Sequence, residues 1–313
     1  MTQVTVRVPA KLNLQLAVGP CRADGYHDLV TVFHAVSLYD EVTVALGDTD
    51  EVSVSGEGAT SVPANGDNLA LRAVRALRGA LPRGTGGGAA SRAGSAGIGD
   101  PVKVTIRKRI PVAAGLAGGS ADAAAALVAC NELWDAGLTQ QQLCDVAADV
   151  GSDVAFAVLG GTVVGRGRGE ELTPALVPSK RYHWVLAFAD AKLATPEVYS
   201  TLDRIRPRAA APELDAGLMA ALRSGDPTRV GKALSNDLQQ AALTMCASLR
   251  KTLAAGTELG ALGAQVSGSG PTCMFLARNA ERALALAAGL TGAGVCRSVA
   301  TATGPVPGAT VRH

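Results

Sequence analysis

A glycine-rich stretch in the first half of the chain has the composition of a phosphate-binding loop. The segment GLAGGSADAAAA places Gly115, Gly118 and Gly119 before a run of strong helix formers that begins at Ser120 and ends at Gly137. Glycines let a polyphosphate approach the backbone, and a helix N-terminus offers unpaired N–H groups and a partial positive charge. Ser120 can cap this helix or bind a metal ion. The segment therefore predicts a polyphosphate site; the alternative is a turn that only packs against a helix.

The amino-acid sequence of this loop excludes two common nucleotide-binding motifs. The GxxxxGK[ST] P-loop requires a lysine that the segment lacks. The dinucleotide-binding GxGxxG motif requires a different glycine spacing and an acidic residue at the end of the next strand. The loop therefore belongs to neither of these classes.

Two charged residues elsewhere in the chain are candidates for acid–base chemistry. Asp153 follows Gly151 and Ser152, between a predicted helix and a predicted apolar strand with the sequence VAFAVLGGTVVG, where its carboxylate can face a cleft. Lys11 interrupts an alternating strand just after Pro9. On position alone, Asp153 is more simply a turn aspartate, and Lys11 a solvated strand lysine.

Hydrophobic periodicity predicts the strands that must position these residues. Apolar residues alternate over residues 4–16, 41–46 and 102–110, and the Asp24-Gly25 dipeptide predicts a turn after the first of them. Lys108 shares the apolar face of the third strand. It either ends that strand or points into a pocket, and the predicted phosphate site just downstream favours the pocket.

Capping residues predict the helices. Asn68 is placed as the N-cap of one helix, and Thr139 and Gln142 have the spacing of a capping box at the start of another, which stops at Gly151. Beyond residue 175 the pattern restarts, with strands expected at 185–189, 264–277 and 294–301 and helices at 196–203, 212–223, 228–255 and 281–290. Predicted strands and helices are mixed in both blocks of the sequence, which predicts two α+β domains.

The composition describes a globular chain without an electrostatic partner. Its 313 residues are 48% hydrophobic and carry a formal net charge of +2, with no dense basic block, so we expect neither nucleic acid nor a membrane as partner. The six cysteines form no CxxC pair, and the four histidines have no zinc-ligand spacing. The opening residues lack an apolar signal segment, and we expect a cytoplasmic location.

Three ordered segments resemble the small-molecule kinases related to galactokinase, homoserine kinase and mevalonate kinase, the GHMP superfamily. They are PAKLNLQL at 9–16, PVAAGLAGGSADAAAAL at 111–127 and VSGSGPTCMF at 266–275. Within the superfamily, RADGYHDL and GSDVAFA are most similar to the 4-diphosphocytidyl-2-C-methyl-D-erythritol kinase family. The departures are Ala117 in the loop and Ala155 and Ala157 after Asp153, and none of them removes a polar group.

The resemblance implies an α+β fold of two domains with the substrate in the cleft between them. The implied N-terminal domain, residues 1–172, is ribosomal-protein-S5-like with a left-handed βαβ crossover and holds ATP; residues 83–100 are expected to be a flexible insertion. The implied C-terminal domain, residues 173–313, is ferredoxin-like, and its last strand can return to the first domain.

The resemblance also implies roles for individual residues. Asp153 is the implied acceptor of the substrate proton, and Lys11 the ammonium that keeps Asp153 ionised and oriented. The implied ATP-binding residues are Asn68 near the adenine and the loop residues Pro111, Val112, Ala113, Ala114, Gly115, Leu116, Ala117, Gly118, Gly119, Ser120 and Ala121, with Ser120 as a metal ligand. The implied substrate-binding residues are Asn13, Tyr26, His27, Lys108, Thr195 and Tyr199. Among these, Tyr26 is implied to stack on the pyrimidine, His27 to hydrogen-bond its edge, and Lys108 to lie near the diphosphate.

The implied function is ATP- and Mg²⁺-dependent phosphorylation of the 2-hydroxyl of a cytidine-diphosphate substrate in non-mevalonate isoprenoid synthesis. Two alternatives stay open: a kinase of the homoserine or mevalonate class, and a catalytically silent nucleotide-binding sensor on the same fold. The DGYH element argues against the first, since those substrates carry no base to stack, and the retention of Lys11 and Asp153 argues against the second. The sequence does not indicate the oligomeric state.

Overall fold

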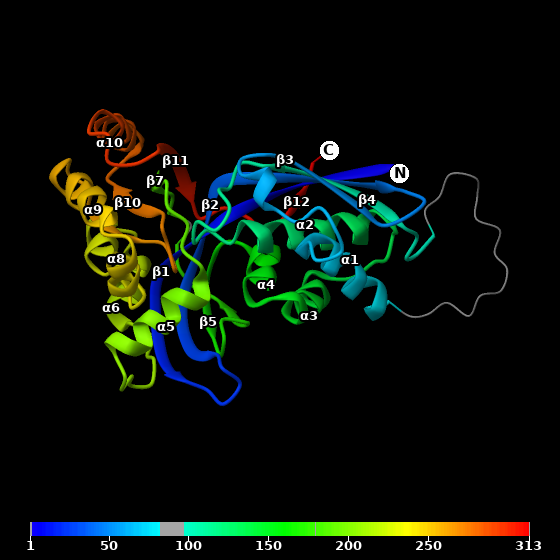
Figure 1. Ribbon diagram of the computed structural model, residues 1–313, viewed down its shortest axis with the longest axis horizontal. Helices are drawn as coiled ribbons and strands as arrows, with labels where there is room; N and C mark the ends of the chain where they lie inside the picture. Colours follow the sequence, from blue (N-terminus) through cyan, green and yellow to red (C-terminus); the bar gives the residue numbers. More distant parts are fainter. Residues whose placement is uncertain (1, 82–96, 179, 313) are drawn as a thin grey trace.

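The computed structural model describes residues 2–81, 97–178 and 180–312 (Figure 1). Most of the insertion expected at 83–100 lies outside the described residues. Its last part, residues 97–100, forms a turn in which the backbone N–H of Asp100 donates to the carbonyl of Gly97 at 3.1 Å.

The N-terminal half is built on two long antiparallel strands. β1 (Gln3–Cys21) and β2 (His27–Leu46) run side by side, and the larger sheet has the order β12-β1-β2-β4-β3. β4 (Val102–Lys108) is antiparallel to β2 and parallel to β3 (Glu51–Gly56). The N-terminal part of β2 pairs with β5 (Thr162–Arg166), and β5 pairs with β6 (Glu171–Pro174). The short strand β8 (Ser235–Asn236) lies parallel to β1. A short 3-10 turn, Ala59–Ser61, follows β3.

Four helices cover one side of this sheet, as Figure 1 shows: α1 (Leu69–Ala80), α2 (Gly118–Leu133), α3 (Gln140–Val150) and α4 (Ser152–Leu159). The predicted caps are confirmed, because the Asn68 side chain accepts from the N–H of Ala70 and Thr139 and Gln142 form the capping box. α2 is the central helix. Most of its residues are buried because the sheet and the other helices surround it.

The strand predicted over VAFAVLGGTVVG is wrong in its first half. Its residues up to Leu159 form α4, and the strand begins only at Thr162. Residues 154–158 are buried on all sides of the helix, so no polar face interrupts the apolar run. Such a run cannot be assigned to helix or strand by periodicity alone. Gly160, with φ of 68°, ends the helix.

The C-terminal half contains a second sheet of order β11-β7-β10-β9, with β7 (Tyr182–Phe188), β9 (Gly263–Val266), β10 (Cys273–Ala277) and β11 (Ser298–Gly304). Its helices are α5 (Thr195–Ile205), α6 (Ala216–Ser224), α7 (Pro227–Lys232), α8 (Gln239–Met245), α9 (Ser248–Glu258) and α10 (Ala280–Gly292). The segment 228–255, predicted to be helical, is divided among α7, α8 and α9. Between α7 and α8 the chain forms β8, which pairs with β1.

The chain crosses between the two sheets more than once. β6 still pairs with β5, and β7 opens the second sheet, so the predicted division after residue 172 falls inside β6. At the other end of the chain, β12 (Thr310–Val311) lies antiparallel to β1. One face of β7 packs into the core of the first half through Trp184 and Leu186, and this joins the two halves. Among the described residues, no helix is both long and apolar enough to span a bilayer.

Candidate active site

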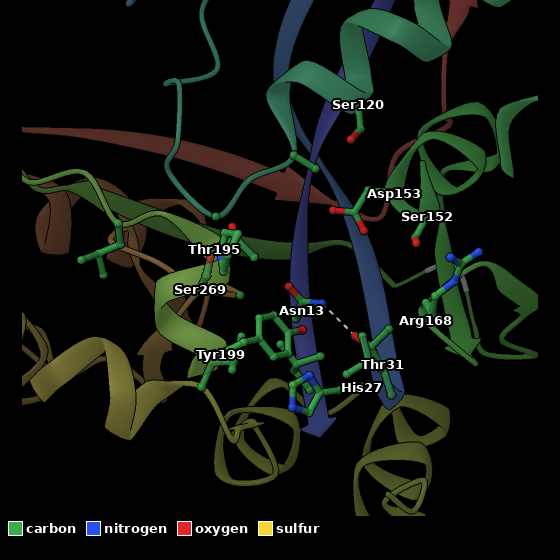
Figure 2. Close-up of a pocket in the computed structure, with 18 of the residues that line it drawn as sticks. Asn13, His27, Thr31, Ser120, Ser152, Asp153, Arg168, Thr195, Tyr199 and Ser269 are labelled. Carbon is green, nitrogen blue, oxygen red and sulfur yellow. Dashed lines mark hydrogen bonds between the residues drawn. The ribbon is translucent and has the colours of Figure 1, made fainter. Parts of the chain in front are cut away.

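A cavity of about 830 Å³ lies between the two halves of the molecule (Figure 2). Its walls come from β1, β2, the glycine-rich loop, the start of α4, the β5–β6 turn, α5 and the turn between β9 and β10. The sequence-predicted site residues that line it are Lys11, Asn13, Tyr26, His27, Ala113, Ala114, Gly115, Ala117, Gly118, Gly119, Ser120, Asp153, Thr195 and Tyr199. Segments far apart in the sequence thus meet around one space.

The glycine-rich loop ends at the N-terminus of α2, where helix N–H groups line the cavity wall. Gly115 has φ of 74°, and a Cβ built there would lie 2.1 Å from the carbonyl oxygen of Ser267. Ala117, the N-cap of α2, also adopts a left-handed conformation, with φ of 56°. The alanine that replaces a glycine therefore keeps the backbone shape of the loop, at some cost in strain.

Asp153 and Lys11 face each other below this loop. Asp153 stands in the first turn of α4, and its carboxylate lies 3.9 Å from the Lys11 ammonium. The N-terminus of α4 and the Lys11 ammonium both place positive potential beside this carboxylate. The sequence placed Asp153 between a helix and a strand, but it lies in the first turn of α4. The helix therefore fixes the position of its side chain.

A chain of hydrogen bonds fixes Lys11 from the other side. Its Nζ donates to Asn13 Oδ1 at 2.6 Å, Asn13 Nδ2 donates to Thr31 Oγ1 at 2.8 Å, and the Thr31 hydroxyl donates to the carbonyl of Gln15 at 2.7 Å. Burial lowers the pKa of Lys11, and the charge of Asp153 only partly opposes this effect. Lys11 is therefore a buried cation whose charge the protein alone compensates incompletely.

An aromatic cluster forms the opposite end of the cavity. The rings of His27 and Tyr199 stack with their centroids 5.0 Å apart, and His27 Nε2 lies 2.9 Å from Asp203 Oδ1 on α5. Burial raises the pKa of Tyr199, and the charge of Asp153 adds to this, so its phenol stays protonated. Tyr26 is 57% exposed at the rim; the Arg168 guanidinium lies over one face of its ring, and the other face can take part in stacking.

The β9–β10 turn closes the cavity from the C-terminal half. Thr195 Oγ1 and Ser269 Oγ are hydrogen-bonded at 2.9 Å, which ties the start of α5 to this turn. Asn236 Nδ2 donates to the carbonyl of Gly268 at 2.8 Å and holds the turn from below. The predicted VSGSGP motif is thus a wall of the site.

Six of the predicted residues do not line this cavity. Pro111 and Val112 line a separate cavity of about 200 Å³, and Leu116 and Ala121 are buried in the core. The Asn68 amide is occupied by the α1 cap and by a hydrogen bond to the carbonyl of Pro63. The sixth predicted residue that does not line the cavity is Lys108, which was expected beside the substrate diphosphate.

Lys108 lies beneath the loop in a buried ionic cluster with Asp40 and Asp122. Its Nζ is 2.5 Å from Asp40 Oδ2 and 2.7 Å from Asp122 Oδ2. Burial lowers the pKa of Lys108, but the two carboxylates outweigh that effect and the net shift is upward. Burial, together with repulsion from Asp40, raises the pKa of Asp122 well above its ordinary value. The ammonium is therefore engaged by two carboxylates and anchors the start of α2 through Asp122, which lies just past the first turn of that helix.

Sequence reasoning missed several residues that line the cavity: Thr31, Phe33, Ser152, Arg168, Asp203 and Ser269. Two of them had a local signal. Asp203 follows Tyr199 by four residues on a predicted helix, and Arg168 is flanked by glycines after a strand, which is typical of an exposed turn. Ser152 and Ser269 lie inside the GSDVAFA and VSGSGPTCMF motifs, which gave them no role of their own. Thr31 and Phe33 became visible only when the strands were assembled.

The comparisons agree with this fold. Residues 68–161 match the family described as GHMP kinases N terminal domain, and residues 218–296 match GHMP kinases C terminal. A crystal structure of 4-(cytidine 5'-diphospho)-2C-methyl-D-erythritol kinase is similar, with 30% identity, a TM-score of 0.73 and coverage of 95% of this chain and 98% of that one. A homoserine kinase structure from Cytophaga hutchinsonii has 19% identity and a TM-score of 0.72, covering 100% of this chain and 98% of that one; it supports the fold alone.

The two-domain α+β architecture and the loop-lined cleft are those of a GHMP kinase, as the sequence analysis predicted. Two relatives named 4-diphosphocytidyl-2-C-methyl-D-erythritol kinase narrow the class. The protein of Thermobifida fusca is 53% identical over 99% of this chain and 98% of its own, and that of Mycolicibacterium smegmatis 51% identical over 98% and 92%. The chain belongs to the 4-diphosphocytidyl-2-C-methyl-D-erythritol kinase family.

Proposed function

We propose that this protein transfers the γ-phosphoryl group of ATP to the 2-hydroxyl of 4-diphosphocytidyl-2-C-methyl-D-erythritol. The observation that carries the proposal is a single cavity with three parts. It holds a glycine-rich helix N-terminus, a carboxylate–ammonium pair 3.9 Å apart and an aromatic cluster. A nucleoside triphosphate, a reacting alcohol and a pyrimidine base each have matching chemistry in this space.

The phosphate chain of ATP is assigned to the loop. Gly118 and Gly119 present backbone to the cavity without a side chain, and the N–H groups of the first turn of α2 favour negative charge. Ser120 Oγ lies in the same wall. Mg²⁺ is commonly held by phosphate oxygens, water and one or two protein oxygens, and the hydroxyl of Ser120 fits that need. When bound, the ion would supply neutralisation of phosphate charge.

Asp153 is the proposed acceptor of the hydroxyl proton. As the substrate oxygen forms its bond to the γ-phosphorus of ATP, the bond from that phosphorus to the β–γ bridging oxygen breaks and ADP leaves, while the hydroxyl proton passes to the Asp153 carboxylate. Lys11 stabilises the charge on that oxygen and on the transferred group, and Asn13 and Thr31 fix the direction of its ammonium. Buried neighbours hold this arrangement before substrate arrives, so little reorganisation is needed at the moment of reaction.

The base of the acceptor is assigned to the end of the cavity formed by Tyr26, His27 and Tyr199. The exposed face of Tyr26 can stack on a pyrimidine. The His27 side chain is 6% exposed and engaged with Asp203, so it acts as a wall of the base site rather than as a freely rotating donor. This refines the role expected from the sequence, in which the His27 ring binds the edge of the base.

The test is ATP consumption by the purified protein with each candidate alcohol. We expect turnover with the cytidylated methylerythritol and none above background with homoserine, mevalonate or uncytidylated methylerythritol phosphate. Equal turnover of homoserine or mevalonate would favour the other kinase class. ATP binding without turnover of any alcohol would favour the sensor.

A further inference from the structure

Arg168 faces the same cavity from the turn between β5 and β6, and the reaction chemistry above gives it no role. The turn is anchored on both sides. The N–H of Leu29 on β2 donates to the carbonyl of Gly167 at 2.7 Å, and a Cβ built on Gly169 would lie 3.8 Å from the Cβ of Ser152. Arg168 is therefore held beside the residue that precedes Asp153.

The position of Arg168 lies between the two ends of the acceptor site. Its guanidinium carbon is 5.1 Å from the centre of the Tyr26 ring, at the base end. Figure 2 shows Arg168 on the same side of the cavity as Ser152 and Asp153, with Thr31 and His27 below it in the view and Thr195, Ser269 and Tyr199 on the opposite side. A ligand that reaches from Tyr26 to Asp153 passes this guanidinium.

Charge distinguishes Arg168 from the other cation of the cavity. Among the described residues that line it, the lysines and arginines are Lys11 and Arg168. The side chain of Lys11 is 9% exposed and committed to Asp153 and Asn13, whereas that of Arg168 is 40% exposed. Arg168 is thus the cation available to an anionic ligand outside the reacting centre.

Its contacts orient the guanidinium without consuming it. Nε lies 3.3 Å from Glu170 Oε1, and the backbone N–H of Arg168 donates to Glu170 Oε2 at 2.5 Å. A guanidinium has five N–H donors in a planar fork, and four of them are on its two Nη atoms. Glu170 therefore holds the Nε edge of the guanidinium, and its carbon lies over the Tyr26 ring. The two Nη atoms form a fork whose geometry matches phosphate oxygens.

We propose that Arg168 binds the diphosphate of the acceptor substrate and so sets the distance between the base site and Asp153. This rests on the proposed function, in which the acceptor joins a cytidine to the reacting alcohol through two phosphates. Arg168 is then a specificity-determining residue: it favours a nucleoside diphosphate acceptor over a neutral alcohol of the same length.

The experiment measures binding of CDP and of cytidine by calorimetry to the full-length protein and to Arg168→Met. Wild type is expected to bind CDP more tightly than cytidine. In Arg168→Met, CDP affinity should fall roughly 10- to 100-fold, the range for a charge-assisted hydrogen-bonded pair, while cytidine affinity changes less than about threefold. Arg168→Lys should recover part of the loss, because a point charge remains without the fork.

Arg166→Met is the matched control. Arg166 is an exposed arginine of the same hairpin, two residues earlier, and it does not line the cavity. It should leave both affinities unchanged, and ATP affinity should be the same in all variants. A loss shared equally by CDP and cytidine in Arg168→Met would assign Arg168 to the shape of the turn instead and overturn the proposal. So would a wild type that binds CDP no better than cytidine.

The outcome is separable from that of the proposed function. Turnover of the cytidylated substrate by wild type tests the function alone. If wild type turns over this substrate and Arg168→Met keeps its CDP affinity, the role of Arg168 is refuted and the function stands. If the CDP difference is present and no turnover is seen, the diphosphate site stands and the proposed reaction fails.

Discussion

Replacing Lys108 by methionine separates the role expected from its sequence position from the role its contacts define. The substitution keeps most of the aliphatic stem and removes the ammonium that bridges Asp40 and Asp122 at 2.5 Å and 2.7 Å. Both carboxyl groups are almost fully buried. The variant therefore leaves two buried acids facing one another without a cation.

The expected cost follows from what remains to stabilise each acid. Breaking a buried ion pair by removing one partner costs about 3–5 kcal/mol. Asp40 Oδ1 still accepts the N–H groups of Arg109 and Ile110, at 2.5 Å and 2.8 Å, and Asp122 can take up a proton. Both effects favour the lower end, so we expect the free energy of unfolding to fall by about 3 kcal/mol.

The assay combines urea unfolding with steady-state kinetics. Asp122 lies just past the first turn of α2, and a Cβ built on Gly118 would lie 3.0 Å from Lys108 Nζ, so losing the anchor should raise the KM for ATP and spare that for the acceptor. Asp122→Asn is the control, because it keeps a partner for the ammonium and removes the excess negative charge. Wild-type stability with a raised acceptor KM in Lys108→Met would refute the anchor and restore the diphosphate role.

The same cluster predicts a pH dependence. The pKa of Asp122 is raised in the folded protein above the ordinary 3.8, so the native state binds more protons than the unfolded chain between those two values. Stability should therefore decline as pH rises from about 3.8 through the folded pKa of Asp122. In Asp122→Asn this decline should be absent. An unchanged pH profile of unfolding in that variant would show that the carboxyl is not strained by its neighbours.

Three further substitutions test the parts of the site. Asp153→Asn should lower kcat by ~10²–10⁴ with little change in substrate binding, and near-normal turnover would remove Asp153 from proton transfer. Gly119→Val should weaken ATP binding in a folded protein, since the nearest side-chain atom to a Cβ there is the Leu69 Cδ1 at 3.3 Å, which can yield; unchanged affinity by calorimetry would make the loop purely structural. Tyr26→Ala should cost about 1–3 kcal/mol of acceptor binding, or roughly 5- to 150-fold in KM, with the KM for ATP unaffected; equal loss for a substrate without a base would argue against stacking.

Local chemistry explains what the sequence predicted well. The caps at Asn68 and Thr139 depend on side chains that bond to backbone two or three residues away, so a short segment contains the whole signal. The glycine-rich loop is similar, because its function depends on consecutive backbone groups. The apolar run after Asp153 failed for the opposite reason: its burial is decided by the elements around it.

Partners distant in the chain explain what the sequence did not predict. His27 meets Asp203, 176 residues away, and Lys108 meets Asp40 across 68 residues. The sequence left open whether Lys108 ends its strand or points into a pocket; it is the last residue of β4, and its side chain is buried. Whether an internal acid or an incoming phosphate compensates such a charge depends on strand pairing that no single segment specifies.

The two buried lysines show how the fold distinguishes an anchor from a reactive group. Lys108 has two carboxylates within 2.7 Å, and they raise its pKa against the effect of burial, so its charge is satisfied by the protein itself. Lys11 has an amide oxygen at 2.6 Å and its carboxylate only at 3.9 Å, and burial lowers its pKa. Further negative charge near Lys11 is therefore stabilised more than it would be near Lys108. The charge that the proposed reaction develops, on the substrate oxygen and the transferred phosphoryl group, appears beside Lys11, where the folded protein has left the compensation incomplete.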